Sequence, residues 1–160
     1  MRRISSRALT RKAVRRCVGQ AEDIRTGLEV QRFLMGLVYA DVSLRNPREP
    51  ELEPLHVQAL VDTGASHLCI PEHVAIQLKL EAAYEREVTT ADGSKRLCRY
   101  VGPIEVRFNG RASFTGALVL GDEVLLGAVP MEDMDLVISP STHNVVVNPQ
   151  SPNIPSATVK

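Results

Sequence analysis

The chain has 160 residues, of which 44% are hydrophobic, and its 19 Lys and Arg residues balance its 19 Asp and Glu residues. This length suits one compact domain with trailing segments and argues against two full domains. With no Trp, three Tyr and three Phe, the chain lacks the aromatic and basic surface that binds single-stranded nucleic acid. No apolar run approaches the roughly 18 residues of a membrane span. We therefore expect no nucleic-acid partner and no membrane partner.

The first 34 residues differ from the rest of the chain in charge, with nine basic residues against three acidic ones. They show no strand alternation and no apolar signal-peptide core, whereas a clear strand pattern begins at Met35. We interpret residues 1–34 as a basic N-terminal extension that is either disordered or a mis-called start, with a transit peptide as the alternative. Three cysteines at irregular spacing fit a reducing compartment, so the sequence predicts a soluble, cytoplasmic protein.

The body of the chain, residues 35–149, consists mainly of short β-type runs separated by turn residues. The clearest runs are residues 36–44, 55–62, 67–71 and 144–149. One short helix is expected at residues 71–81, with Pro71 in its first turn. Its partly apolar face would contain Val74, Ile76, Leu78 and Leu80.

Two hairpins are predicted after this helix. The first spans residues 86–100 and turns at Ala91, Asp92 and Gly93, and the second spans residues 104–120 and turns at Asn109-Gly110. Residues 123–140 predict an apolar strand, a glycine, a short polar turn and another strand. The tail, residues 150–160, is rich in Pro and Ser, and we expect it to be flexible.

The stretch ALVDTGAS, residues 59–66, places a carboxylate at the end of an apolar strand. A carboxylate at the inner end of a buried strand is costly unless it is paired, hydrated or used. In an Asp-Thr-Gly turn, Gly64 brings a backbone N–H toward the carboxylate, the Thr63 hydroxyl can reach a neighbouring loop, and Asp62 faces a cleft. This arrangement suits aspartic peptidase chemistry, which needs two carboxylates that share a proton.

No second Asp-Thr-Gly or Asp-Ser-Gly occurs in the chain. The pair of carboxylates can therefore arise only if two chains meet around a two-fold axis and each supplies its Asp62. The sequence thus predicts a homodimer. The terminal strands at residues 36–42 and 144–149 are the expected dimer contacts.

These residues give the chain a resemblance to the retroviral-type, or retropepsin-like, aspartic proteases, specifically to their cellular bacterial and archaeal relatives. The matching segments are ALVDTGAS, VLLG at residues 124–127 and MDLVI at residues 134–138. The resemblance covers about residues 36–148 and implies an all-β fold, a closed or orthogonal β-barrel subunit with one or two short helices.

The resemblance also implies roles for individual residues. Asp62 would be catalytic, and Thr63, Gly64, Ala65 and Ser66 would form the active-site loop. Leu125, Leu126 and Gly127 would support that loop as a second motif, and a hairpin with Thr90, Ala91, Asp92 and Gly93 at its tip would cover the substrate as a flap. The sequence departs from the viral pattern in two places, because the flap has Gly93 alone and because Ala128 follows Gly127 where a charged residue is common.

Alternative chemistry near this motif is less well supported. His67, Cys69 and His73 lie close in sequence, but alternation puts His67 and Cys69 on one strand face while His73 lies on the expected helix. No fourth ligand follows at zinc-like spacing, so no metal site is expected. Cys69 and His67 have no third group to form an activated thiol, and Cys69 is expected to be a small buried core residue. His56 and His143 are expected at the surface.

The sequence therefore predicts an aspartic endopeptidase that works as a homodimer on a peptide or protein substrate without a cofactor. In this hypothesis, water is activated by Asp62 from each subunit. The alternative is a catalytically inactive peptide-binding or structural dimer of the same fold.

Overall fold

The structure, a computed structural model, describes residues 36–139 and 141–157. The extension predicted for residues 1–34 lies outside the described residues. In chain order the described elements are β1 (Val38–Arg45), β2 (Leu55–Val61), β3 (Leu68–Ile70), α2 (Glu72–Gln77), β4 (Ala82–Thr89), β5 (Lys95–Phe108), β6 (Arg111–Val119), β7 (Leu125–Leu126), α3 (Ala128–Asp133), β8 (Leu136–Ser139) and β9 (Asn144–Val147). The predicted all-β class with short helices is confirmed.

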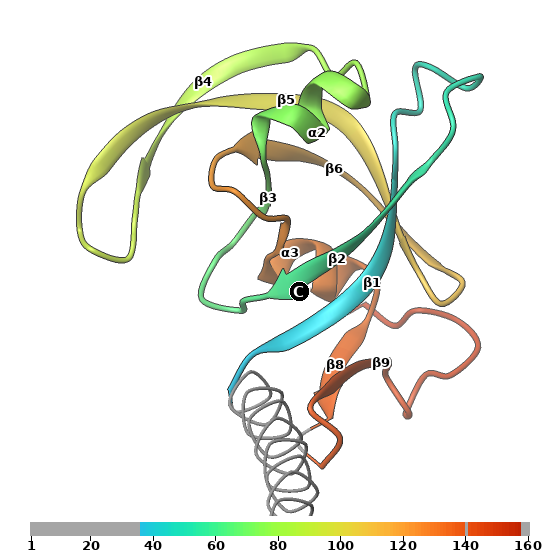
Figure 1. The fold of residues 1–160 in the computed structure, drawn as a ribbon. Helices are drawn as coiled ribbons and strands as arrows, with labels where there is room; N and C mark the ends of the chain where they lie inside the picture. Colours follow the sequence, from blue (N-terminus) through green and yellow to red (C-terminus); the bar gives the residue numbers. More distant parts are fainter. Residues whose placement is uncertain (1–35, 140, 158–160) are drawn as a thin grey trace, which may run out of the picture. The chain divides into compact units, whose positions relative to one another are not determined.

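Six strands close into a barrel in the order β1-β2-β7-β3-β6-β5, because β5 pairs back onto β1 (Figure 1). Strand β4 pairs only with β5 and extends the sheet beyond the barrel. Pairing of β1 with β5 removes the free edge that β1 would otherwise present, with its unpaired N–H and C=O groups. The predicted closed barrel is confirmed. Among the described residues, neither helix has the length or the apolar character needed to cross a membrane.

The core of the barrel follows from the alternation of side chains along its strands. In β1, Ala40, Val42 and Leu44 are buried, whereas the residues between them are more exposed. Strands β3, β5 and β7 contribute fully buried Leu68, Ile70, Ile104 and Leu126. Burying each such side chain stabilises the fold by about 1.5–3 kcal/mol, so the barrel forms a rigid support for the loops at its ends.

The helix α2 is shorter than the predicted range 71–81 and starts one residue later. Pro71 has an extended backbone and lies at the N-cap position, outside the first turn. Val74 and Leu78 are buried as predicted, but Ile76 is 66% exposed, so its assignment to the apolar face is wrong. The physical reason is geometric, because a residue two positions from Val74 lies almost opposite it on a helix with 3.6 residues per turn.

A buried asparagine fixes the end of α2 against the loop after β1. The Asn46 side chain donates to the carbonyls of Leu78 and Lys79 at 2.9 and 3.1 Å, and its Oδ1 accepts from the backbone N–H of Arg48 at 2.9 Å. Carbonyls at a helix end have no partner within the helix. Asn46 therefore supplies the hydrogen bonds that α2 cannot make itself.

Both predicted hairpins form at the predicted turns. Asn109 and Gly110 have φ of +45° and +81° between the paired residues Phe108 and Arg111, as a two-residue turn with two positive φ angles requires. In the β4–β5 hairpin, Gly93 has φ +80°, and Thr90 and Ser94 close the turn through a backbone hydrogen bond of 2.9 Å.

The segment after Gly127 differs from its prediction as a short polar turn, because it forms helix α3. Pro130 lies in the first turn of this helix, where a missing N–H costs no hydrogen bond. Met131 and Met134, three residues apart, are buried against the core, whereas Glu132 and Asp133 face solvent. The acidic residues that indicated a turn are the exposed face of an amphipathic helix.

A hydrogen-bonded carboxylate joins the C-terminal segment to the α3–β8 junction. Asp135 accepts from Asn148 Nδ2 at 2.9 Å, from the Ser156 N–H at 2.9 Å and from the Ser151 hydroxyl. These bonds lower the pKa of Asp135 to about 2, with the Ser151 bond contributing most. Strands β8 and β9 pair with each other in a separate two-stranded sheet. The boundary predicted at residue 149 stays a prediction.

Candidate functional site

Asp62 lies directly after β2, where the strand leaves the barrel, and its side chain is exposed. Its Oδ1 accepts a hydrogen bond from the Gly64 N–H at 2.9 Å, and its backbone carbonyl accepts from the Ala65 N–H at 3.1 Å. The turn thus holds the carboxylate through its own backbone, as the Asp-Thr-Gly sequence predicts. The carboxylate faces outward from a tight, internally bonded loop.

The loop around Asp62 is held on one side by strand β7. This short strand lies between β2 and β3, with Leu60 beside Leu125, Val61 beside Leu126, and Cys69 beside Leu125. The Asp62 N–H donates to the Leu126 carbonyl at 3.1 Å. The second motif predicted from the sequence therefore lies next to the Asp62 loop.

Gly127 and the start of α3 complete this support. The N–H groups of Ala128 and Val129 donate to the carbonyls of Ala65 and Ser66 at 2.8 and 3.0 Å. A Cβ on Gly127 would lie 2.4 Å from the His67 carbonyl oxygen and 2.7 Å from that of Ala65. Only glycine allows these two backbones to approach so closely.

The remaining residues of the predicted active-site loop have less defined contacts. Thr63 and Ser66 are exposed, and no side-chain hydrogen bond joins either of them to another described residue. Ala65 is half-buried and contributes its backbone. The Thr63 hydroxyl is thus open to a neighbouring loop or chain.

The predicted flap residues form the tip of the β4–β5 hairpin, which arches away from the barrel (Figure 1). Asp92 accepts from the Thr90 hydroxyl at 2.5 Å and from the Ser94 N–H at 3.0 Å, and these bonds lower its pKa to about 2. Gly93 provides the positive φ of the turn, and Ala91 is exposed. The tip is therefore a turn in which the ionised Asp92 side chain accepts a hydrogen bond from the backbone of Ser94.

A cluster of four side chains, His67, Tyr84, Arg86 and Tyr100, joins the Asp62 loop to the base of this hairpin. Arg86 Nη1 donates to His67 Nε2 at 2.5 Å, and the rings of Tyr84 and Tyr100 stack with centroids 4.9 Å apart. Because arginine has only donors, His67 accepts through an unprotonated Nε2. Burial, followed by the charge of Arg86, lowers the pKa of His67 and favours this neutral form.

The two described cysteines differ from the expectation in their burial. Cys98 is buried and Cys69 is only half-buried, so the expectation of Cys69 as a buried core thiol is wrong. Burial raises the pKa of Cys69, and the nearby Cys98 and Asp62 raise it further, which keeps Cys69 a neutral thiol. His73 is exposed on α2, and His56 and His143 are exposed as expected. The described residues contain no group of three His, Cys, Asp or Glu side chains suited to hold a metal ion.

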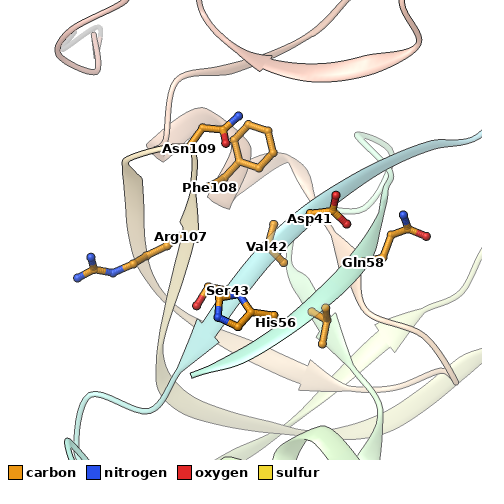
Figure 2. A pocket seen from close by; sticks show the side chains of 9 residues that line it. Asp41, Val42, Ser43, His56, Gln58, Arg107, Phe108 and Asn109 are labelled. Carbon is orange, nitrogen blue, oxygen red and sulfur yellow. The ribbon is translucent and has the colours of Figure 1, made fainter. Parts of the chain in front are cut away.

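A cavity of about 440 Å³ is lined by residues of β1, β2 and β5 and by Asn109, and Asp62 is not among them (Figure 2). Its polar lining includes Asp41, Ser43 and His56, which are residue types found in nucleophilic sites. No hydrogen bond joins these three side chains to one another in the described chain, and nucleophilic activation requires one. Figure 2 also shows the Arg107 side chain extending away from them. Asp41, Ser43 and His56 therefore do not form an activated nucleophile in the described chain.

Sequence reasoning missed the contribution of β4 to the site. Alternation along this strand places Tyr84, Arg86 and Val88 on one face, a pattern that is visible in the sequence. The partner of that face is not visible there, because His67 reaches Arg86 only through the curvature of the hairpin over β3. Val129 was also missed, because its segment was predicted as a turn.

Comparison with known families agrees with this geometry. The family described as gag-polyprotein putative aspartyl protease matches residues 52–129, which include the Asp62 loop, the β4–β5 hairpin and Gly127. No curated protein matches the chain. The matched family is one of retropepsin-like aspartyl proteases, which supports a protease-like function in general. Over residues 52–129, the chain is therefore similar to the retropepsin-like aspartyl proteases.

Proposed function

We propose that the protein is an aspartic endopeptidase whose active site forms between two copies of the chain. The observation that carries this proposal is the single outward-facing Asp62, which the Gly64 N–H and the β7 backbone hold in place. Peptide hydrolysis by this route needs one carboxylate as base toward water and another as acid toward the carbonyl. A two-fold axis beside Asp62 would supply both from one motif.

Exposed apolar side chains on either side of the Asp62 loop support this assembly. Val38 pairs with Val61, so Leu37 lies at the same end of the barrel as Asp62, and Leu37 is 45% exposed. On the other side, Val129 is 49% exposed and its N–H bonds to Ser66. A subunit contact around Asp62 would bury both side chains, which favours association. The Thr63 hydroxyl would face the partner loop across the axis.

The β4–β5 hairpin would close over a bound peptide. Residues 91–93 at its tip are exposed, and the contact between Arg86 and His67 turns its inner face toward the Asp62 loop. Closure of such a hairpin excludes water from the reacting peptide bond and orients it. No cofactor takes part in this chemistry.

A subunit-mixing experiment tests the shared pair of carboxylates. Wild-type protein is refolded with an equal amount of the Asp62→Asn variant, and cleavage of a peptide library is measured. Random pairing leaves about a quarter of the dimers with two Asp62 side chains, so activity per wild-type chain falls to about half. Native mass spectrometry measures the mixed dimers.

The control uses Asp122→Asn, which removes an exposed carboxylate outside the expected dimer contacts at residues 36–42 and 144–149. Every dimer formed with this variant has two Asp62 side chains, so mixing should leave the activity per total chain unchanged. Activity strictly proportional to wild-type chains, with mixed Asp62→Asn dimers present, would contradict the shared site. A wild-type protein that cleaves no library peptide would favour the inactive peptide-binding dimer.

A further inference from the structure

The guanidinium of Arg86 lies on the inner face of the β4–β5 hairpin, on the side of the Asp62 loop. Arg86 pairs across the hairpin with Cys98, which is buried, and its Nη1 contacts His67, five residues after Asp62. His67 directly follows the Asp62 loop, so this contact brings the hairpin face next to that loop. Arg86 therefore places a positive charge beside the candidate site.

Aromatic and polar contacts hold this guanidinium in one orientation. Its central carbon lies 5.1 Å from the Tyr100 ring centroid and 5.6 Å from that of Tyr84, and Nη2 donates to the Tyr84 hydroxyl at 3.2 Å. The Tyr100 ring in turn lies directly on Gly116, where a Cβ would approach to 2.3 Å. These contacts already restrict the Arg86 side chain, so it loses less conformational entropy when it binds a ligand.

The charge of Arg86 is not neutralised within the described part of the chain. On the outer face of the same hairpin, Lys95 pairs with Glu87 at 2.8 Å and Arg99 pairs with Glu72. Arg86 forms no ion pair with a described carboxylate. Two of its five N–H groups donate to His67 and Tyr84, and the other three form no hydrogen bond with a described residue.

We propose that Arg86 binds a carboxylate of the peptide held between the hairpin and the Asp62 loop, so that the site selects acidic substrates. An oriented guanidinium with open donors binds a planar carboxylate through parallel hydrogen bonds. The carboxylate belongs either to an Asp or Glu side chain or to the C-terminus of a short peptide. This inference rests on the proposed function, because it assigns the substrate class of that same site.

The test uses decapeptide libraries in which each position in turn carries Glu or its neutral counterpart Gln, each made with a free or an amidated C-terminus. Cleavage by the wild-type protein should favour Glu over Gln at one position about tenfold, since a hydrogen bond to a charged group contributes at least about 1.4 kcal/mol. A preference that depends only on the free C-terminus would identify the terminal carboxylate instead.

Three variants assign the preference to Arg86. Arg86→Gln should remove the preference, and Arg86→Lys, which keeps the charge but not the planar fork, should retain part of it. Arg99→Gln removes a neighbouring outer-face charge and should leave the preference unchanged. Thermal unfolding of each variant checks its fold, and Arg86→Lys provides the measurement if Arg86→Gln does not fold.

The outcomes separate this inference from the proposed function. If the wild-type protein cleaves peptides without an acidic preference, or if Arg86→Gln and Arg86→Lys both keep the full preference, the inference is wrong and the endopeptidase remains. If nothing is cleaved, the same peptides are labelled and their binding is measured by fluorescence anisotropy. Binding about tenfold tighter to Glu peptides that is lost in Arg86→Gln supports carboxylate recognition, and equal binding of both peptides overturns it.

Discussion

At the scale of single residues, the position of the Asp62 carboxylate depends on the smallest side chains around it. Gly64 donates its N–H to Asp62 Oδ1, and a Cβ at Gly64 would lie only 3.1 Å from that oxygen. The backbone of Gly64 is outside the left-handed region, so its role is close approach and not turn conformation. Gly127 also permits close approach, but its neighbours are backbone atoms.

Replacing Gly64 with alanine should lower the turnover number and leave folding nearly unchanged. The new methyl group displaces the Asp62 carboxylate by a few tenths of an ångström, and such displacements reduce reaction rates because reacting groups need defined geometry. We expect a loss of roughly tenfold or more in kcat, measured on a library peptide, with a melting temperature near that of the wild type.

Gly127→Ala provides the contrast to Gly64→Ala. Its Cβ would meet backbone atoms at 2.4 to 2.8 Å, which cannot move without disturbing β7 and the Asp62 loop. Overpacking of this kind costs about 1–3 kcal/mol, so the melting temperature should fall. Equal melting temperatures for the two variants would contradict these separate roles.

At the scale of elements, the β4–β5 hairpin presents two faces with different charges. Its outer face holds cations in ion pairs with Glu87 and Glu72, and its inner face holds Arg86 against two tyrosines and His67. At the tip, Asp92 keeps a pKa of about 2, chiefly through the Thr90 hydroxyl. Asp92 therefore stays ionised, and keeps these hydrogen bonds, below the usual titration range of an aspartate.

Replacing Gly93 with valine should lower turnover much more than it lowers stability. Gly93 has φ +80°, and a Cβ added there would have no neighbouring atom within 4 Å, so the substitution strains only the backbone of the tip. A β-branched residue is strained at positive φ, and the exposed tip relieves that strain by changing its turn conformation. Gly93→Asn is the matched control, because asparagine tolerates positive φ.

Kinetics on a library peptide and thermal unfolding distinguish these effects. We expect Gly93→Val to reduce kcat/KM severalfold and Gly93→Asn to remain close to the wild type, with both melting temperatures little changed. If the valine and asparagine variants have the same kinetics, the tip does not contact substrate or move over it.

At the scale of the whole molecule, Asp135 ties the C-terminal segment to the end of α3. Its folded pKa of about 2 lies below the value near 3.9 of an unfolded chain. A depressed pKa contributes stability that is fully present above the unfolded value and is lost as pH falls through the folded value. The contribution of Asp135 should therefore be complete above about pH 4 and lost toward about pH 2.

The Asp135→Asn variant tests this dependence. Asparagine accepts the positive φ of +51° at this position, so the turn geometry is kept while the charge is removed. Denaturant unfolding should show a stability difference from the wild type at neutral pH that disappears between about pH 4 and pH 2. Asp41→Asn, which removes an exposed carboxylate without a described hydrogen bond, should show a smaller difference. A difference for Asp135→Asn that does not change with pH would contradict the role of its charge.

Much of this architecture could be predicted from short stretches of sequence. Asn109-Gly110 and Asp92-Gly93 define their hairpins because few residues adopt positive φ, and the Asp-Thr-Gly turn predicts the bond from Gly64 to Asp62. These features are local, so that their physical causes lie within a few residues. The closed barrel followed from the resemblance that these motifs carry.

The features that could not be predicted depend on contacts between distant segments or on competing local signals. Helix α3 was missed because Pro130 and two acidic residues indicate a turn until the burial of Met131 and Met134 is known. The contact between His67 and Arg86 depends on how the hairpin curves over β3. Neither a propensity nor a periodicity contains that information.

The insertion of β7 between β2 and β3 also determines the order in which the molecule can be built. The Asp62 N–H bonds to the Leu126 carbonyl, and the loop that follows bonds to Ala128 and Val129, all far along the chain. Contacts between such distant residues form late, because a long loop must close before they stabilise anything. A chain still emerging from the ribosome holds the Asp-Thr-Gly turn without its support until Val129 has been synthesised. The Asp62 loop therefore gains its supporting hydrogen bonds only after the chain has been synthesised through Val129. A truncated chain that ends before Leu126 lacks these hydrogen bonds.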